Sequence, residues 1–232
     1  MPKRNFRHAG IVRMIHMIDD SVFESNCDIL VNTINCRGVM RAGIALEFAL
    51  RYPRMYKEYV QDCNESKINT GKTYLYECDG QKILNFPTKD DYKEPSLIEY
   101  LVEGLNFFVE HYKEYGANSI AFPLLGCTNG GLNFEKDVKP IMLEYLSDID
   151  MDVYICTNNL CSGLELLMLN CIKSFPISKM MSDLNITDFA PEVLGMNIQL
   201  SNRFWQLASK KAVGSIDNYI KIWNYIRSKI DQ

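Results

Sequence analysis

Short apolar runs alternate with amphipathic stretches over the first two thirds of the chain. Runs of about four to eight residues that are rich in β-branched and aromatic side chains are typical of strands. The pattern predicts strands at residues 11–18, 28–34, 73–78, 82–86, 119–125 and 152–157. The run at 28–34 is apolar at nearly every position, which favours a strand buried on both faces of a sheet.

Helical spacing of apolar residues separates these strands. Residues 44–50 and 55–63 form one helical run that Pro53 interrupts. Residues 96–115 predict a long amphipathic helix with Ser96 as its N-cap and Gly116 after its end, and residues 135–146 predict another. Alternating strands and helices, with an Asp79-Gly80 hairpin between 73–78 and 82–86, predict a three-layer α/β domain over residues 9–158.

The pattern changes after residue 158. A Met- and Leu-rich helical run is broken at Pro176, and two further helices are predicted at residues 202–213 and 215–230. We therefore predict a helical C-terminal extension over residues 159–232. Residues 193–232 hold six Lys/Arg against two Asp/Glu. Two interpretations stay open: the helices cover the domain or a partner copy, or they dock a protein or nucleic acid.

Composition narrows the class of protein. Hydrophobic residues make up 47% and charged residues 23%, which is typical of globular chains. A net charge of -4 argues against a protein that binds nucleic acid over its whole surface. No apolar run approaches membrane-spanning length, so we expect a soluble, cytoplasmic protein without membrane attachment. The eight cysteines include no Cys-x-x-Cys pair and are expected to be reduced.

Two predicted strands run into glycine-bearing loops, at residues 35–43 and 126–131. Glycine lets backbone N–H groups turn toward an anion, and the following helix N-terminus adds a partial positive charge. Either loop alone also fits an ordinary strand-to-helix connection. Because ligands bind beyond the carboxyl ends of strands, both loops and the Asn-Phe-Pro-Thr-Lys segment at 85–89 can share one edge of the sheet.

Other chemistry is disfavoured. Gly71-Lys72-Thr73 lacks the earlier glycine of a nucleotide-binding P-loop and precedes a strand. The histidines at 8, 16 and 111 lack metal-ligand spacing, and no Gly-x-Ser-x-Gly motif occurs, so we predict neither a metal site nor a serine hydrolase. Asn32 and Asn35 can offer ribose hydroxyls both a donor and an acceptor. The sequence thus favours a ligand with a diphosphate joined to ribose.

Three separated motifs resemble the macrodomain family, and within it the DarG-type antitoxin macrodomains, which remove ADP-ribose from DNA bases. The motifs are Val31-Asn32-Thr33-Ile34-Asn35-Cys36 with Gly38-Val39-Met40 and Gly43-Ile44-Ala45-Leu46; Asn85-Phe86-Pro87-Thr88-Lys89; and Pro123-Leu124-Leu125-Gly126-Cys127 with Asn129-Gly130-Gly131-Leu132. The resemblance spans residues 10–158 and implies a three-layer α/β/α macrodomain with a central mixed sheet.

The resemblance also implies roles for individual residues. Lys89 and Asn35 would be catalytic, with Asn35 on the distal ribose, and the loops at 38–43 and 126–131 would each hold one phosphate. The implied ADP-ribose contacts are Asp20, Asn32, Asn35, Gly38, Val39, Met40, Gly43, Ile44, Pro87, Thr88, Leu125, Gly126, Cys127, Thr128, Asn129, Gly130 and Gly131. No cofactor or metal is implied, since ADP-ribose is itself the ligand or product.

The chain departs from the family pattern at several positions. Arg41-Ala42 stand where Gly-Lys is usual, Thr128 replaces a glycine, and Asp90, Asp91 and Tyr92 replace aromatic and basic residues. A positive φ at Thr128 would be costly because of its Cβ.

The expected activity is that of an ADP-ribosyl glycohydrolase acting on a modified target such as a DNA base. It would counteract an ADP-ribosyltransferase toxin or defence enzyme. Expected partners are ADP-ribose, ADP-ribosylated DNA and that toxin. The alternatives are a non-catalytic module that binds ADP-ribose or a related nucleotide, and an interaction-type antitoxin.

Overall fold

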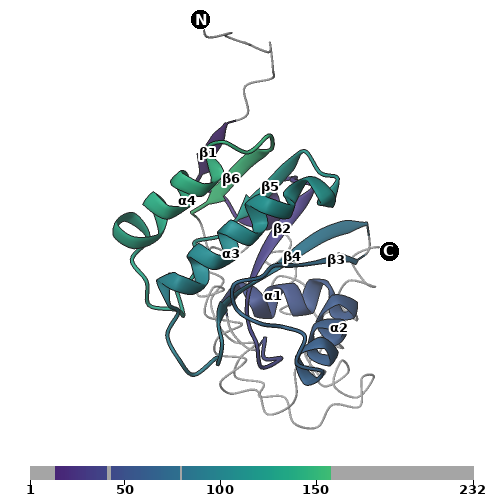
Figure 1. Cartoon of the computed structure of the whole chain (residues 1–232). Coiled ribbons are helices and arrows are strands. Elements are labelled where there is room, and N and C mark those ends of the chain that lie inside the picture. Colours follow the sequence, from purple (N-terminus) through teal and green to yellow (C-terminus); the bar gives the residue numbers. More distant parts are fainter. Residues whose placement is uncertain (1–13, 41–42, 79, 158–232) are drawn as a thin grey trace, which may run out of the picture.

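Six strands form one mixed sheet in the order β1-β6-β5-β2-β4-β3 (Figure 1). The computed structural model describes residues 14–40, 43–78 and 80–157 of the 232-residue chain. The strands are β1 (Ile15–Ile18), β2 (Ile29–Asn35), β3 (Tyr74–Cys78), β4 (Gln81–Lys89), β5 (Ser119–Phe122) and β6 (Asp152–Cys156).

All neighbouring strands are parallel except β3, which forms an antiparallel hairpin with β4. β2 pairs with β4 along its whole length but with β5 only at Ile29 and Leu30. Six of its seven residues are buried, as its continuous apolar sequence predicts. The carboxyl ends of β1, β2, β4, β5 and β6 therefore meet at one edge of the sheet.

Helices cover both faces of the sheet. α1 (Gly43–Arg51) and α2 (Pro53–Asn64) pack on one face, and α3 (Ile98–His111) and α4 (Lys139–Leu146) on the other (Figure 1). Phe48 and Tyr59 belong to the first apolar cluster, whereas Phe108 and Met142 belong to the second. This arrangement confirms the predicted three-layer α/β/α architecture with a central mixed sheet.

Several predicted element ends are wrong. The helix predicted at 96–115 begins at Ile98, its N-cap is Leu97 without a side-chain bond, and a 3-10 turn takes over at Tyr112–Tyr115. β5 ends at Phe122 because Pro123 follows. β4 continues past Phe86 to Lys89. Pro87 fits there because β3 pairs with β4 only as far as Asn85, so one side of the strand is already unpaired.

The helix predicted at 135–146 has two parts. A π-helical turn, Phe134–Val138, precedes α4. Asn133 caps this turn, since its Oδ1 accepts the Lys136 N–H at 2.9 Å while the Asp137 carboxylate accepts the Asn133 N–H at 3.0 Å. This reciprocal cap, one residue longer than the usual capping box, favours the wider turn.

Some predictions concern residues outside the described ranges: positions 11–13 of the first strand, Arg41, Ala42, Asp79 and the whole C-terminal extension. The six cysteines within those ranges form no disulfide with one another. Among the same residues, no helix has the length and apolar character needed to cross a membrane.

Gly104 allows α3 to lie close to the sheet. A Cβ on Gly104 would stand 2.5 Å from the Cζ of Phe86 in β4. We expect Gly104→Ala to destabilise the protein by about 1–3 kcal/mol through overpacking, against about 1 kcal/mol gained in helix propensity. Chemical denaturation would measure this, with solvent-facing Asn106→Ala as the control on the same helix. Adding Phe86→Leu should recover part of the loss, and additive effects would contradict a direct clash.

Candidate functional site

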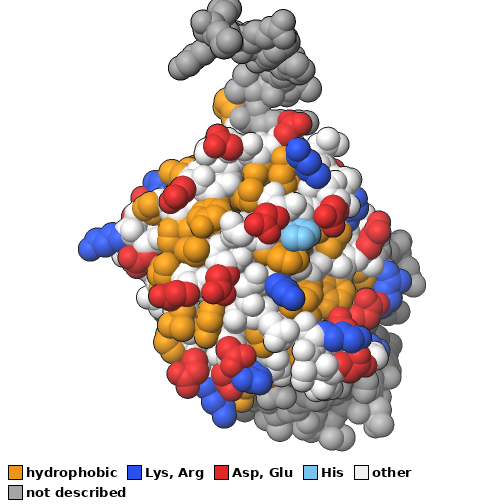
Figure 2. All heavy atoms as spheres, viewed as in Figure 1, with side chains coloured by type: hydrophobic (Ala, Val, Ile, Leu, Met, Phe, Trp, Pro, Cys, Tyr) orange, Lys and Arg blue, Asp and Glu red, His pale blue; other side chains and the backbone are white. Residues whose placement is uncertain are grey.

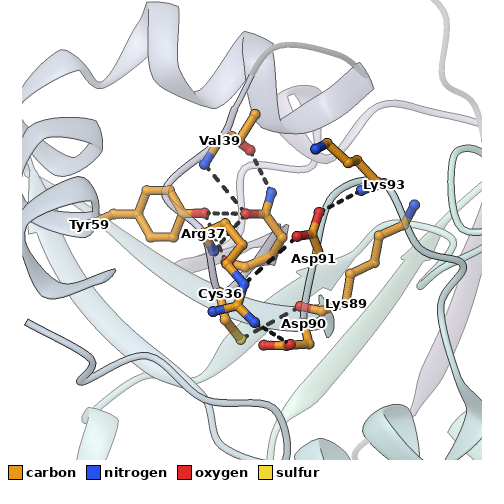
Figure 3. Close-up of polar contacts among 9 residues, drawn as sticks. Cys36, Arg37, Val39, Tyr59, Lys89, Asp90, Asp91 and Lys93 are labelled. Carbon is orange, nitrogen blue, oxygen red and sulfur yellow. Dashed lines mark hydrogen bonds and ion pairs between the residues drawn. The ribbon is translucent and has the colours of Figure 1, made fainter. Parts of the chain in front are cut away.

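The Asn35 side chain organises the loop that follows β2. Its Nδ2 donates to the Val39 carbonyl at 2.6 Å, and its Oδ1 accepts the Arg37 N–H at 2.9 Å and the Val39 N–H at 3.4 Å (Figure 3). Tyr59 of α2 donates its hydroxyl to the Asn35 carbonyl at 2.8 Å. Gly38, with φ of 73°, makes the turn that these bonds enclose. The Asn35 amide thus holds the loop through bonds to its backbone, and the Tyr59 hydroxyl holds the backbone of Asn35 itself.

The loop that follows β5 is closed by its own backbone. Leu132 N–H donates to the Gly126 carbonyl at 3.1 Å, and Gly126 and Gly131 take the left-handed φ values of 66° and 83°. Gly130 is needed for a different reason: a Cβ there would lie 2.1 Å from the Gly126 oxygen. Thr128 is not among the residues with positive φ. The threonine at this position therefore imposes no left-handed strain on the loop.

Lys89 links the end of β4 to this second loop. Its Nζ donates to the Asn129 carbonyl at 2.7 Å. Between Ile34 and Asn35 the β2–β4 register shifts, so that Asn35 stands opposite Lys89 and Thr88 is passed over. Burial lowers the pKa of the Lys89 ammonium, against a smaller opposing effect of Glu94. The predicted catalytic pair is thus brought together at one point of the sheet edge.

Asn129 also lies close to the first glycine loop. A Cβ on Gly43, at the start of α1, would lie 2.7 Å from the Asn129 Nδ2. Gly43 has φ of 56°, so both conformation and space favour glycine there. The loops predicted to hold two phosphates are therefore neighbours, as their positions after β2 and β5 suggested.

Arg37 compensates for the acidic residues that follow Lys89. Its guanidinium lies 2.5 Å from the Asp90 carboxylate and 3.9 Å from that of Asp91 (Figure 3). The Asp90 carbonyl accepts the Cys36 N–H at 2.9 Å. Both residues of the main ion pair are about half exposed, at 53% and 50%, so the pair adds little stability. It links the first glycine loop to the segment that follows Lys89. The two aspartates that replace the usual residues of the family at positions 90 and 91 thus pair with Arg37.

The other predicted site residues fall into two groups. Those exposed or half-exposed, and so able to meet a ligand, are Asp20, Gly38, Val39, Gly43, Ile44, Cys127, Thr128, Asn129 and Gly131. Those buried in this structure are Asn32, Met40, Pro87, Thr88, Leu125, Gly126 and Gly130.

The buried residues support the loops from below. Asn32 is 0% exposed and donates from Nδ2 to the Asn85 Oδ1 at 2.8 Å, facing the interior. Met40 is also 0% exposed and lies in the cluster beneath α1 and α2. In these positions both side chains serve packing, and any ligand contact of this group has to come from backbone atoms.

Asp20 lies apart from the two glycine loops along the chain and in the sheet. It follows β1, and its Oδ1 accepts the Ser21 N–H at 2.9 Å. The next segment packs on α1, since the Phe23 and Phe48 rings lie 4.7 Å apart. Three strands separate β1 from β4 in the sheet, so Asp20 can serve only the far end of an extended ligand.

The thiols near the loops are not nucleophiles at neutral pH. Burial, with a contribution from Asp137, raises the pKa of the Cys127 thiol to about 11. Burial and then Asp90 raise the pKa of the Cys36 thiol to about 12. Both therefore stay protonated, and Lys89 is the basic side chain anchored directly to the second loop.

Two supporting residues were missed by the sequence analysis. Tyr59 is 0% exposed, and its place in the predicted helical run at 55–63 gave no sign of its bond to Asn35. Ser96 was predicted as a helix N-cap, yet it is 3% exposed, donates its N–H to the Gly130 carbonyl at 3.0 Å, and its Oγ would lie 2.2 Å from a Cβ on Gly130. No sequence signal distinguishes this role from a cap, because it depends on a loop 30 residues away.

Comparisons with known proteins agree with this geometry. The sequence model of the Macro domain family matches residues 31–141. A DNA ADP-ribosyl glycohydrolase from Mycobacterium tuberculosis is 37% identical over 148 residues, which cover 61% of this chain and 42% of that protein. The chain thus spans less than half the length of this curated relative.

Solved structures give the same result. The macrodomain of Thermus aquaticus DarG is 34% identical with a TM-score of 0.59, covering 62% of this chain and 98% of that one. Thermosipho africanus DarTG, solved in complex with ADP-ribose, is 31% identical with a TM-score of 0.58, covering 61% of this chain and 41% of that one. The fold and its two glycine loops define a macrodomain. The chain belongs to the macrodomain family.

The two glycines of the second loop provide a matched pair of variants. A Cβ on Gly130 would collide with the Gly126 carbonyl, whereas a Cβ on Gly131 would meet nothing within 4 Å and only its φ of 83° is unfavourable. We expect Gly131→Ala to cost about 1–2 kcal/mol and Gly130→Ala clearly more, since the backbone itself has to move. Chemical denaturation of both variants tests this. Equal losses of stability in the two variants would contradict the prediction, because they would mean that the contact with the Gly126 carbonyl adds no cost.

Proposed function

We propose that this chain is an ADP-ribosyl glycohydrolase that releases ADP-ribose from a modified DNA base, and so opposes an ADP-ribosyltransferase. The observation that carries the proposal is the Lys89 ammonium, anchored 2.7 Å from the carbonyl of Asn129 in the second glycine loop and opposite Asn35 in the sheet. The named activity of the M. tuberculosis relative and the ADP-ribose in the T. africanus structure support it.

The two loops suit the diphosphate of ADP-ribose. Each combines left-handed glycines with a helix or turn that begins just after it, which directs N–H groups toward an anion. Asn129 lies between them, next to Gly43. A diphosphate bound across both loops places the distal ribose toward Asn35 and Lys89, at the ends of β2 and β4.

The reaction breaks the bond between the anomeric carbon C1 of the distal ribose and a nitrogen of the base. The oxygen of a water adds to C1, and free ADP-ribose and unmodified base result. One proton of that water ends on the base, either directly or by replacing a proton that Lys89 has given to the base. Lys89 assists by donating a proton to the departing base or by stabilising its negative charge. Desolvation, which lowers the pKa of Lys89, makes its ammonium a stronger acid than a solvated lysine.

Asn35 has a positioning role in this scheme. Its amide already holds the Arg37 to Val39 backbone, so one Nδ2 hydrogen is left for a ribose hydroxyl. Because Tyr59 fixes the Asn35 backbone, the amide keeps its orientation before the ligand arrives. Such preorganisation reduces the free energy spent on ordering the site.

Replacing Lys89 tests the proposal. Lys89→Ala should lower the turnover of a single-stranded oligonucleotide carrying ADP-ribosylated thymine or guanine by about 100- to 10,000-fold. Its affinity for ADP-ribose, measured by calorimetry, should change little, because the Leu132–Gly126 and Ser96–Gly130 backbone bonds still hold the second loop without Lys89. Lys67→Ala, which removes a surface lysine paired with Glu65, is the control and should behave as wild type.

Two outcomes would contradict the assignment. If wild type binds ADP-ribose but leaves every DNA, Asp/Glu and Ser adduct intact, the domain is a binding module. If Lys89→Ala keeps full turnover, another group performs the chemistry.

The pH dependence of turnover tests the protonation state. A reaction that needs the Lys89 ammonium is fully active below the pKa of Lys89 and declines as the pH rises through it. Because burial lowers this pKa from the usual 10.5, the decline should begin at a lower pH than for a solvated lysine. Lys89→Arg keeps its charge at all accessible pH values, so its slower turnover should lack this alkaline decline. An unchanged profile in Lys89→Arg would assign the titration to another group.

A further inference from the structure

The segment between Lys89 and α3 is a rigid loop, although it lies at the surface. Its start is held by the Asp90 carbonyl on the Cys36 N–H at 2.9 Å, and its end by the Ser96 N–H on the Gly130 carbonyl at 3.0 Å. Asp91 forms a turn between these points, since its Oδ1 accepts the Lys93 N–H at 2.9 Å and its carbonyl accepts the Glu94 N–H at 3.1 Å. The loop is therefore fixed to both glycine loops.

Tyr92 stands at the tip of this fixed loop with its ring in solvent. It is 46% exposed and belongs to neither apolar cluster of the described residues. The Lys93 ammonium lies 5.5 Å from the centre of its ring. Tyr92 thus presents an exposed aromatic ring on an anchored loop, three residues after Lys89.

We propose that Tyr92 and Lys93 form a subsite for single-stranded nucleic acid. Tyr92 stacks on a nucleobase of the strand that carries the modification, and Lys93 contacts an adjacent phosphate. This inference rests on the proposed function and adds to it a contact with the strand beyond the modified nucleoside.

The chemistry of the pair fits a nucleic acid strand. Base stacking on an aromatic ring is tolerant of sequence, and a cation beside the ring meets the backbone phosphate. An enzyme that acts on a base has to meet it outside the duplex stack, where neighbouring bases need a new stacking partner. Tyr92, fixed in place at both ends of its loop, offers that partner with little loss of conformational entropy.

The charges around the site point to a local contact. Asp90 and Asp91 would repel a phosphate, but both face the Arg37 guanidinium, which leaves Lys93 to meet the strand (Figure 3). On the face shown in Figure 2, acidic and basic side chains are interspersed, without a wide basic surface. The net charge of -4 likewise argues against binding through a long-range field.

Affinity measurements on the full chain test the subsite. In a Lys89→Ala background, which prevents turnover, binding is compared for ADP-ribose, ADP-ribosylated thymidine and a single-stranded oligonucleotide with the same modified thymine. We expect the oligonucleotide to bind more tightly than the nucleoside. Tyr92→Ala should weaken oligonucleotide binding by about fivefold to a hundredfold and leave ADP-ribose binding unchanged, whereas Tyr92→Phe should behave as the parent.

Lys93→Ala separates the phosphate contact from the stacking contact. It should reduce the slope of log affinity against log salt by about 0.7 for the oligonucleotide only. Leu143→Ala, which shortens another exposed apolar side chain (39% exposed) on α4, is the control and should change nothing.

Each outcome decides the inference. It is overturned if the oligonucleotide binds no more tightly than the nucleoside, if Tyr92→Ala leaves the difference intact, or if Tyr92→Ala weakens ADP-ribose to the same extent. Failure of the proposed function has a different signature, since wild-type Lys89 protein would then leave both the nucleoside and the oligonucleotide modified.

Discussion

The pairing of β2 with β4 is the constraint on which the site depends. These two central strands run parallel from Ile29 to Asn35, and a single shift in register near their ends sets Asn35 opposite Lys89. Without the shift, Asn35 would face Thr88. The amide that shapes the first loop and the ammonium that reaches the second are therefore positioned by backbone pairing, which is far stiffer than any loop.

The loops at this edge are connected to one another as well as to the strands. Asn35 holds the first loop, Lys89 and Ser96 hold the second, and Arg37 joins the first loop to the segment after Lys89. A ligand thus meets a surface that is already ordered. It also meets competition, because a phosphate near Asn129 has to share the Lys89 ammonium with the carbonyl that now holds it. The bond that orders Lys89 before a ligand arrives therefore also makes its ammonium less available to that ligand.

Much of the fold could be predicted because it depends on local pattern. The continuous apolar run at 28–34 identified the central strand, and Asp79-Gly80 identified the hairpin. The strand predicted at 82–86 was too short, since β4 continues to Lys89 and Pro87 argues against a strand unless the neighbouring strand has already ended. Ser96 was misassigned for a related reason. Its tertiary partner, the Gly130 carbonyl, is absent from its local sequence, and a serine before a helix is ordinarily a cap. The roles of Tyr59 and Arg37 could not be predicted, because they depend on contacts with Asn35 and Asp90 that only the folded structure brings about.

The pair of buried amides below the site has a consequence for folding fidelity. Asn32 and Asn85 are direct cross-strand partners, both 0% exposed, and the Asn32 Oδ1 has no hydrogen-bond partner among the described residues. Two leucines would fill this space without an unsatisfied acceptor, which costs about 1–3 kcal/mol. Leucines, however, would pair as well with a neighbour one residue away. The amides penalise any such misalignment by leaving more polar atoms unpaired, so they favour a unique alignment of the two strands that carry the site at the cost of some stability.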